Sequence, residues 1–337
     1  MSTAFELPTD REATAPAEAR GLERDQVRML VADGGALTHA RFREIGSFLR
    51  PGDLLVVNNS ATMPAALDAE VDGVPAVLHC STWLDDGSWV VELRSIDGHP
   101  WRRPLGPGAT IDLPGSATVT LRTPWLPPAR RLWVAEFDAD VRELLARSGR
   151  PVTYAYVRQR WSADYYRTAF GRDLGSAEMP SAGRPFTDRL VTDLISQGIS
   201  FAPITLHTGV SSPEFGEPPS PERYAVPEST ARLVNTTHDA GNRVVAVGTT
   251  VTRALETVAD ETGRVHAGSG WTDLVLGAAR PARTVDGLVT GWHAPGASHL
   301  QLLESVAGAE AIRHAYGAAL AAGYLWHEFG DSALLLR

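Results

Sequence analysis

One segment constrains the fold more than any other: a run of β-branched residues that breaks at a glycine and continues as a helical pattern. Residues 243–253 read Arg-Val-Val-Ala-Val-Gly-Thr-Thr-Val-Thr-Arg. This order predicts a strand that ends before Gly248 and a helix that begins near Thr249 and Thr250. Ligands of open α/β sheets bind at the carboxyl ends of strands, and the free N–H groups of a helix start suit a polar or anionic group. We therefore expect a ligand site here, although many strand–glycine–helix turns bind nothing.

The rest of the chain predicts two architectures. Residues 1–66 and 138–337 alternate strand and helix patterns, as in the helix expected at 186–198 and the strand expected at 199–207. Residues 67–137 contain short alternating runs separated by turn sequences, which is typical of a small antiparallel barrel or sandwich. We therefore expect an α/β body with a mixed sheet and an inserted small antiparallel β-barrel domain, which together make an α+β multidomain protein. The loop at 211–220 contains four prolines or glycines and is a predicted mobile lid.

Composition excludes several classes of chemistry. The 31 basic residues are all arginine, so a Schiff-base lysine and a P-loop lysine are both ruled out. Cys80 is the single cysteine, which rules out internal disulfides and a cysteine-built zinc or iron–sulfur site. No run of 18 apolar residues and no export signal are recognisable, so we expect a cytoplasmic monomer that does not associate with membranes.

Arginine clusters are the candidates for contact with RNA. The net charge of −9 argues against broad, non-specific binding of nucleic acid, but a local patch can still hold phosphates. The clusters are Arg102-Arg103, Arg130-Arg131 and Arg158-Gln-Arg160-Trp161. Arg158, Arg160 and Trp161 combine charge with an aromatic ring and are the best candidates for nucleic-acid binding. The simpler interpretation is that these arginines are only solvated.

Ten short motifs follow one another along nearly the whole chain. They are Phe5-Glu-Leu-Pro8, residues 50–60 (Arg-Pro-Gly-Asp-Leu-Leu-Val-Val-Asn-Asn-Ser) with Pro64, Tyr166-Arg-Thr-Ala-Phe170, Pro180-Ser-Ala-Gly183 with Phe186-Thr187, Thr205-Leu-His-Thr-Gly209, Glu222-Arg-Tyr-Ala-Val-Pro227, Val247-Gly-Thr-Thr250 with Arg253, Trp271-Thr-Asp273, Trp292-His-Ala-Pro295 and Gly330-Asp331. In their order and spacing the chain resembles the S-adenosylmethionine:tRNA ribosyltransferase-isomerase family, whose members complete the epoxide precursor of queuosine.

The resemblance implies an α/β body that carries a small β-barrel, and an unusual reaction. The ribosyl group of S-adenosylmethionine, rather than its methyl group, is transferred to an aminomethyl-deazaguanine in tRNA. It rearranges to an epoxy-cyclopentanediol (epoxyqueuosine formation), and adenine and methionine are released. S-adenosylmethionine is then a substrate, and no metal or other cofactor is needed. Such a reaction needs a base near the ribose and an acid near the adenine ring.

Three segments depart from the usual family pattern. Family members usually show Asn-Asp-Thr-Arg-Val-Ile-Pro-Ala-Arg where residues 58–66 read Asn-Asn-Ser-Ala-Thr-Met-Pro-Ala-Ala. The usual Ala-Gly-Leu-His-Phe-Thr is Ala-Gly-Arg-Pro-Phe-Thr at 182–187, and the usual His-Ser-Glu is Ser-Pro-Glu at 220–222. The lost groups are of the kind that hold phosphates or transfer protons. Two alternatives therefore stay open: a diverged paralogue that uses S-adenosylmethionine with a free small-molecule acceptor or cleaves it, and a catalytically dead binding module.

The same motifs supply the candidate site residues. The catalytic candidates are His207 at the end of a predicted strand, His293 in a loop, Asp331 in a turn and Glu222 after the predicted lid. The substrate-binding candidates are Asn58, Asn59, Ser60, Ser181, Gly183, Phe186, Thr187, Thr205, Tyr224, Gly248, Thr249, Thr250, Arg253, Trp271, Thr272 and Asp273.

Several of these residues also have a simpler structural interpretation. A strand-end histidine is often part of the core, and Asp331 suits a solvated turn. The ring of Trp271 suits adenine or the sulfonium, but it also suits an ordinary core position. Arg253 could pair with Glu256 along one helix face instead of binding a ligand. Asn58, Asn59 and Ser60 could simply cap a turn.

Overall fold

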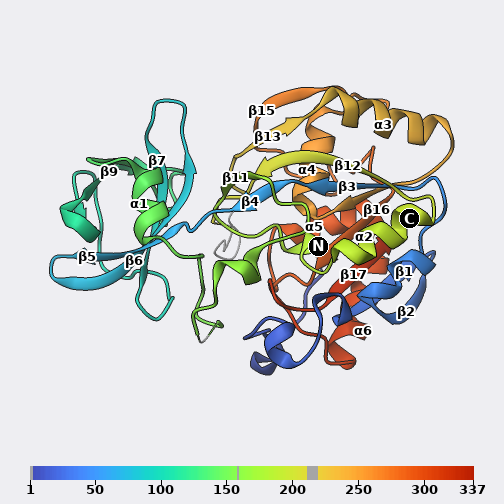
Figure 1. The fold of residues 1–337 in the computed structure, drawn as a ribbon, viewed down its shortest axis with the longest axis horizontal. Helices are drawn as coiled ribbons and strands as arrows, with labels where there is room; N and C mark the ends of the chain where they lie inside the picture. Colours follow the sequence, from blue (N-terminus) through green and yellow to red (C-terminus); the bar gives the residue numbers. More distant parts are fainter. Residues whose placement is uncertain (1–2, 158, 211–218) are drawn as a thin grey trace.

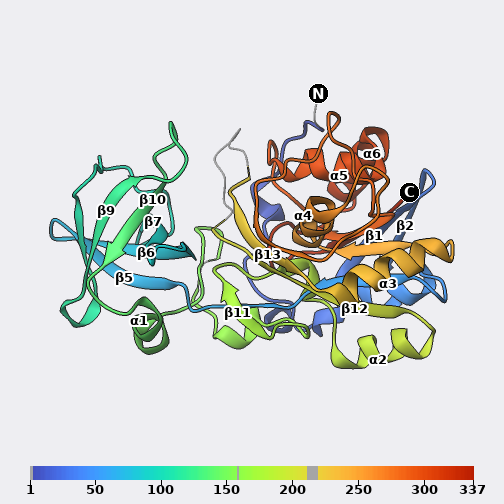
Figure 2. The ribbon, with the colours of Figure 1, turned by 90° about the horizontal axis from the view of Figure 1, so that it is seen from above.

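The computed structural model describes residues 3–157, 159–210 and 219–337. Arg158 and most of the predicted lid therefore lie outside the described residues. The chain forms a larger α/β body and a smaller barrel, which lie at the two ends of the long axis (Figures 1 and 2). The predicted fold class, a mixed sheet with a closed antiparallel barrel, is confirmed. Within the described ranges, no helix combines the length and the apolar character that crossing a bilayer requires.

The body is built on a nine-stranded sheet with the order β15-β13-β12-β3-β14-β16-β17-β1-β2. Its strands are β1 (Arg28–Asp33), β2 (Ala36–Arg41), β3 (Leu54–Asn58), β12 (Ser200–His207), β13 (Glu222–Val226), β14 (Val244–Val247), β15 (Gly268–Thr272), β16 (Gly287–Gly291) and β17 (Ser332–Leu336). Strands β12, β3, β14 and β16 run parallel to one another in the middle of the sheet. Their carboxyl ends consequently lie at one edge.

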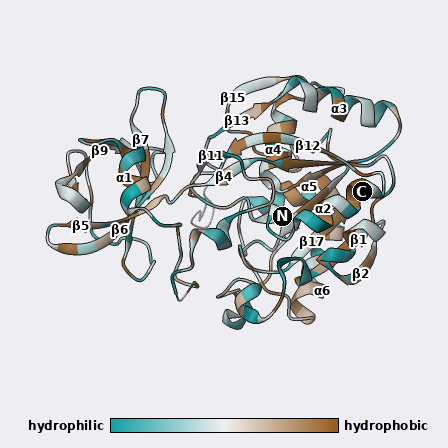
Figure 3. Ribbon diagram, viewed as in Figure 1, coloured by the Kyte–Doolittle hydropathy of each residue, from teal (hydrophilic) through white to brown (hydrophobic). Residues whose placement is uncertain are grey.

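Both faces of this sheet are covered. Alternate side chains of β3 enter different cores: Leu54 and Val56 belong to one apolar cluster, and Leu55 and Val57 to the other. The first cluster is completed by α3 (Glu228–Asp239), α4 (Thr249–Val258), α5 (His299–Ala307) and α6 (Ala309–Ala321), and the second by α2 (Asp188–Ser196) and a 3-10 helix at Phe42–Ser47. The sheet strands are accordingly among the most hydrophobic segments (Figure 3). Two-sided burial explains why the central strands read as continuous apolar runs.

The barrel closes six antiparallel strands in the order β10-β7-β6-β5-β8-β9. They are β5 (Ala66–Val71), β6 (Val74–Trp83), β7 (Trp89–Ser95), β8 (Thr110–Asp112), β9 (Thr118–Pro124) and β10 (Leu132–Phe137). Helix α1 (Val141–Ser148) adds three buried side chains to the barrel core. A short parallel pair, β4 (Ser60–Thr62) with β11 (Asp173–Ser176), lies between the barrel and the body (Figure 2).

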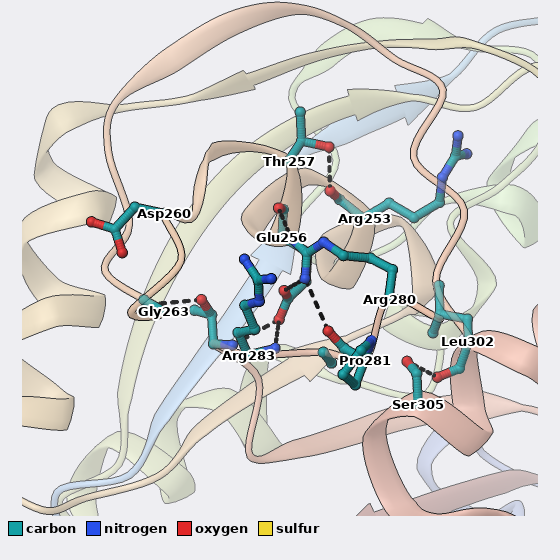
Figure 4. Close-up of polar contacts among 12 residues, drawn as sticks. Arg253, Glu256, Thr257, Asp260, Gly263, Arg280, Pro281, Arg283, Leu302 and Ser305 are labelled. Carbon is teal, nitrogen blue, oxygen red and sulfur yellow. Dashed lines mark hydrogen bonds and ion pairs between the residues drawn. The ribbon is translucent and has the colours of Figure 1, made fainter. Parts of the chain in front are cut away.

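Helix α4 is held in place by the buried carboxylate of Glu256, as Figure 4 shows. Its Oε1 atom accepts hydrogen bonds from the backbone N–H groups of Arg283 and Thr284, both at 2.7 Å. Its Oε2 atom lies 3.4 Å from the guanidinium of Arg280, and the Glu256 side chain is 0% exposed. The carboxylate therefore ties α4 to the loop that leads into β16.

We expect the substitution Glu256→Ala to destabilise the protein by about 3–5 kcal/mol, because it leaves buried donors and a cation without their acceptor. Glu228→Ala is the matched control. It removes a carboxylate whose pairing with Arg232 is exposed, and should cost no more than about 0.5 kcal/mol. Urea unfolding followed by circular dichroism compares them. Equal midpoints for the two variants would contradict this role of Glu256.

Candidate active site

A cavity of about 310 Å³ lies at the carboxyl edge of the central parallel strands. Five stretches of backbone supply most of its wall: residues 178–182, 208–210, 247–250, 290–299 and 327–328. Three of these stretches directly follow or include the ends of β12, β14 and β16. Tyr154, Tyr156 and Arg131 line it from the barrel side. The wall is completed by Pro219, Ser220, Glu222 and Arg253. This cavity, which we call the sheet-edge cavity, is therefore located where the strand–glycine–helix segment predicted a ligand site.

Gly248 shapes the part of the wall where α4 begins. Its φ of 101° and ψ of 153° lie in a region that residues with a side chain rarely adopt. Its backbone N–H donates to the carbonyl of Val289 in β16 at 2.8 Å. Within the described residues no side chain caps this helix start. The first N–H groups of α4, with the hydroxyls of Thr249 and Thr250, consequently stand at the cavity without a competing cap.

Arg253 lies one turn further along α4 and is occupied by the protein itself. One terminal nitrogen forms an ion pair with Glu222 of β13, and the other donates to the carbonyls of Thr272 (3.1 Å) and Ser220 (3.2 Å). Burial raises the pKa of Glu222, although the guanidinium opposes that shift. The alternative interpretation, in which Arg253 pairs with Glu256, is wrong, because the Arg253 guanidinium points away from Glu256 (Figure 4). The Arg253–Glu222 pair holds the cavity wall together.

Three histidines line the cavity, and loss of hydration keeps them neutral. His293 stacks on His299 with ring centroids 4.5 Å apart, and its Nε2 atom lies 3.0 Å from the hydroxyl of Thr290. Desolvation lowers the pKa of His293 well below its ordinary value and that of His299 to about 4. Desolvation also lowers the pKa of His327, whose ring stacks on Tyr156 at 4.3 Å. At neutral pH these imidazoles are therefore unprotonated, which is the form that a proton acceptor must have.

Two carboxyl groups face the same space. Glu178 accepts a hydrogen bond from the hydroxyl of Tyr154. The Oε1 atom of Glu328 is buried and has no hydrogen-bond partner among the described residues. Burial, reinforced by the negative charge of Glu178, raises the pKa of Glu328 to about 8. Glu328 is therefore a carboxylic acid at neutral pH and can donate a proton.

The cavity gathers only part of the predicted site. The predicted residues in its wall are His293, Glu222, Ser181, Gly248, Thr249, Thr250 and Arg253. It also contains residues that the sequence did not single out, chiefly Tyr154, Tyr156, Glu178, His299, His327 and Glu328. They come from loops and a helix start without a shared spacing, so no local pattern identifies them.

His207 lies in a separate polar cluster and does not line the cavity. Its Nδ1 atom is 2.8 Å from the hydroxyl of Ser60, which in turn lies 2.6 Å from that of Ser176. Asn58 joins β3 to β12 through both the N–H and the carbonyl of Leu206. The hydroxyl of Thr205 donates to Asn59 at 2.7 Å. These contacts link the strands β3, β4, β11 and β12.

Asp331, a predicted catalytic or ribose-binding residue, lies outside this cavity and is bound by other parts of the protein. It accepts hydrogen bonds from the backbone N–H groups of Arg28 (2.8 Å) and Leu325 (2.9 Å). It also forms an ion pair with the Arg28 guanidinium at 2.7 Å and is 5% exposed. The carboxylate therefore joins this turn to the start of β1.

The other predicted residues also lie outside the cavity wall. Phe186 is 0% exposed in the core, and Thr187 caps α2 through the N–H of Leu190. Trp271 packs against the guanidinium of Arg223 at 4.7 Å, and its indole N–H faces Asp85 of the barrel at 3.4 Å. The remaining residues of this group are Gly183, Tyr224, Thr272 and Asp273.

The candidates for nucleic-acid binding are only partly described. Arg160 is 70% exposed and lies 3.6 Å from Asp68 of β5. Trp161 contacts the ring of Tyr165 edge to face at 5.3 Å. Arg158 lies outside the described residues. As for metals, the described part of the chain contains no group of three or more histidine, cysteine, aspartate or glutamate side chains placed to hold an ion.

Comparisons with known proteins cover nearly the whole chain. The model of the family described as queuosine biosynthesis protein matches residues 2–335. A Moorella thermoacetica protein named S-adenosylmethionine:tRNA ribosyltransferase-isomerase is 35% identical over 350 residues, covering 98% of both chains. One of the same name from Desulfitobacterium hafniense is 33% identical, with the same coverage. The crystal structure of an S-adenosylmethionine tRNA ribosyltransferase from Thermotoga maritima matches with a TM-score of 0.55 and 28% identity over 99% of both chains. The resemblance inferred from the motifs is confirmed, and the chain belongs to the queuosine biosynthesis protein family.

Proposed function

We propose that the protein binds S-adenosylmethionine in this cavity and transfers its ribosyl group to an aminomethyl-deazaguanine in tRNA. The ribosyl group rearranges in the process, and adenine and methionine leave. Family membership and the names of the relatives support this activity. The observation that carries it is the presence, in one cavity, of neutral imidazoles and a carboxylic acid whose pKa is raised to about 8. These are the base and the acid that the reaction needs at neutral pH.

The wall also matches the charges of the proposed substrate. The uncapped start of α4, with Thr249 and Thr250, suits the carboxylate of the methionyl group. The carboxyl of Glu178 and the rings of Tyr154 and Tyr156 suit the sulfonium, which is attracted by negative charge and by aromatic faces. Arg253 positions this wall rather than binding the ligand, because its nitrogens already bind protein acceptors.

The proton transfers follow from the same geometry. A sulfonium acidifies the neighbouring C5′ hydrogens, so a neutral imidazole can remove one and start the rearrangement. We assign this role to His293, whose ring is held by Thr290 and by stacking on His299. Adenine leaves more readily when one of its ring nitrogens is protonated, and Glu328 carries the proton for that step.

The products with and without tRNA test this proposal and separate it from the alternatives. We expect free adenine and methionine only when S-adenosylmethionine and tRNA bearing the aminomethyl-deazaguanine are both present. Quantitative chromatography of the nucleobase and the amino acid measures this. Adenine release without tRNA would instead indicate a small-molecule acceptor or simple cleavage. Binding of S-adenosylmethionine without any release would indicate a binding module.

Glu328→Gln tests the proposed acid. Because the raised pKa keeps the carboxyl protonated below about pH 8, wild-type turnover should fall as the pH rises above that value. The amide cannot supply the proton, so we expect turnover to drop by about 10²- to 10⁴-fold and the fall above pH 8 to disappear. Glu228→Gln, an exposed carboxyl, is the control. A Glu328→Gln enzyme with an unchanged pH–rate profile would remove Glu328 from the mechanism.

His293→Ala and His207→Ala form a matched pair. We expect the first substitution to lower kcat by at least about 10²-fold, because it removes the proposed base. The second removes the contacts of His207 with the Ser60 hydroxyl and the Trp83 ring, which lie outside the cavity, so its kcat per folded molecule should stay within a few-fold of wild type. Steady-state adenine release, corrected for the folded fraction by circular dichroism, compares the two. Equal losses for both variants would contradict the assignment.

A further inference from the structure

A second cavity, of about 370 Å³, lies on the barrel between residues 100–105 and 129–131. Arginines that are distant in the sequence converge there: Arg103 comes from the first segment, and Arg130 and Arg131 from the second. Trp101 and Trp133 form part of the same wall. We call these five residues the arginine–tryptophan cavity. Apart from Arg131, these residues do not line the sheet-edge cavity.

The arginine–tryptophan cavity carries uncompensated positive charge. Arg103 and Arg130 are exposed, as is Arg102 beside them. None of the three forms an ion pair with a carboxylate in the part of the chain that the structure describes. Arg131 differs, since it is bound to the buried Glu92 at 2.8 Å. In a chain with a net charge of −9, an uncompensated cluster of this kind favours an anionic partner.

An aromatic face accompanies the charge. Trp101 is half-buried, and the guanidinium of Arg103 lies 6.0 Å from the centre of its ring. The buried indole N–H of Trp101 has no hydrogen-bond partner among the described residues. Arginines for phosphates, together with an aromatic ring for a base, are the groups with which proteins hold single-stranded RNA.

The arginine–tryptophan cavity adjoins the sheet-edge cavity. Arg131 lines both of them. The two cavities are therefore neighbours, so that a polymer held on the barrel would lie next to the sheet-edge cavity, whereas a free small acceptor would have no use for the barrel arginines.

We propose that the arginine–tryptophan cavity binds an RNA segment of the tRNA that flanks the nucleotide presented to the sheet-edge cavity. Arg103 and Arg130 contact backbone phosphates, and Trp101 stacks on a base. This inference rests on the proposed function, because it takes the acceptor to be part of an RNA.

The double variant Arg103→Ala/Arg130→Ala tests the inference, and the double variant Arg122→Ala/Arg147→Ala is its control. The control removes the same charge from exposed positions on β9 and α1, outside the cavity. The probe is a fluorescently labelled, unmodified tRNA transcript, and anisotropy gives Kd at several salt concentrations. We expect the first variant to raise Kd at least tenfold and to reduce the slope of log Kd against log salt by about 1–2, because two phosphate contacts are lost. The control should stay within about twofold of wild type.

Trp101→Ala and Trp101→Phe separate stacking from charge. We expect the alanine variant to weaken binding roughly tenfold without changing the salt slope, and phenylalanine to restore most of the affinity.

Calorimetry with S-adenosylmethionine, together with the melting temperature, should give wild-type values for every variant. Failure of wild type to bind S-adenosylmethionine would count against the proposed function. Wild-type affinity for tRNA in Arg103→Ala/Arg130→Ala, equal losses in the control, or no binding of tRNA by wild type would overturn this inference.

Discussion

The parallel pairing of β12, β3, β14 and β16 is the constraint on which the rest of the structure depends. Because these strands run in one direction, their carboxyl ends meet at one edge, and the segments that follow β12, β14 and β16 line one cavity there. Gly248 lets the chain turn from β14 into α4 at that edge with the helix start left open. Barrel-side residues such as Tyr154 and Tyr156 then close the space from the opposite direction.

Burial in this cavity separates the protonation states of its groups. The same loss of hydration lowers the pKa of the imidazoles and raises that of Glu328, since it disfavours the charged form of each. Opposite shifts leave a proton acceptor and a proton donor together at neutral pH. A reaction that removes a proton beside a sulfonium and protonates a departing purine uses both.

The sequence predicts the strand–glycine–helix segment and the barrel well because each is signalled by local periodicity and by turn residues. It predicts the site less well, because the direction of a side chain depends on strand register. His207 ends β12 and faces Ser60, whereas the next residue, Thr208, lines the cavity. Asp331 follows Gly330 in one of the motifs, yet its partner Arg28 is 303 residues away along the chain. No local pattern could have revealed that pairing, or the meeting of Glu328 with Glu178.

A crystal structure of the protein with bound S-adenosylmethionine tests the central claim most directly. The account predicts density for the nucleoside inside the sheet-edge cavity, with the amino-acid carboxylate at the start of α4 and the purine within hydrogen-bonding distance of Glu328. Density in the polar cluster around His207 and Ser60, or a sheet-edge cavity that stays unfilled at saturating ligand, would contradict it.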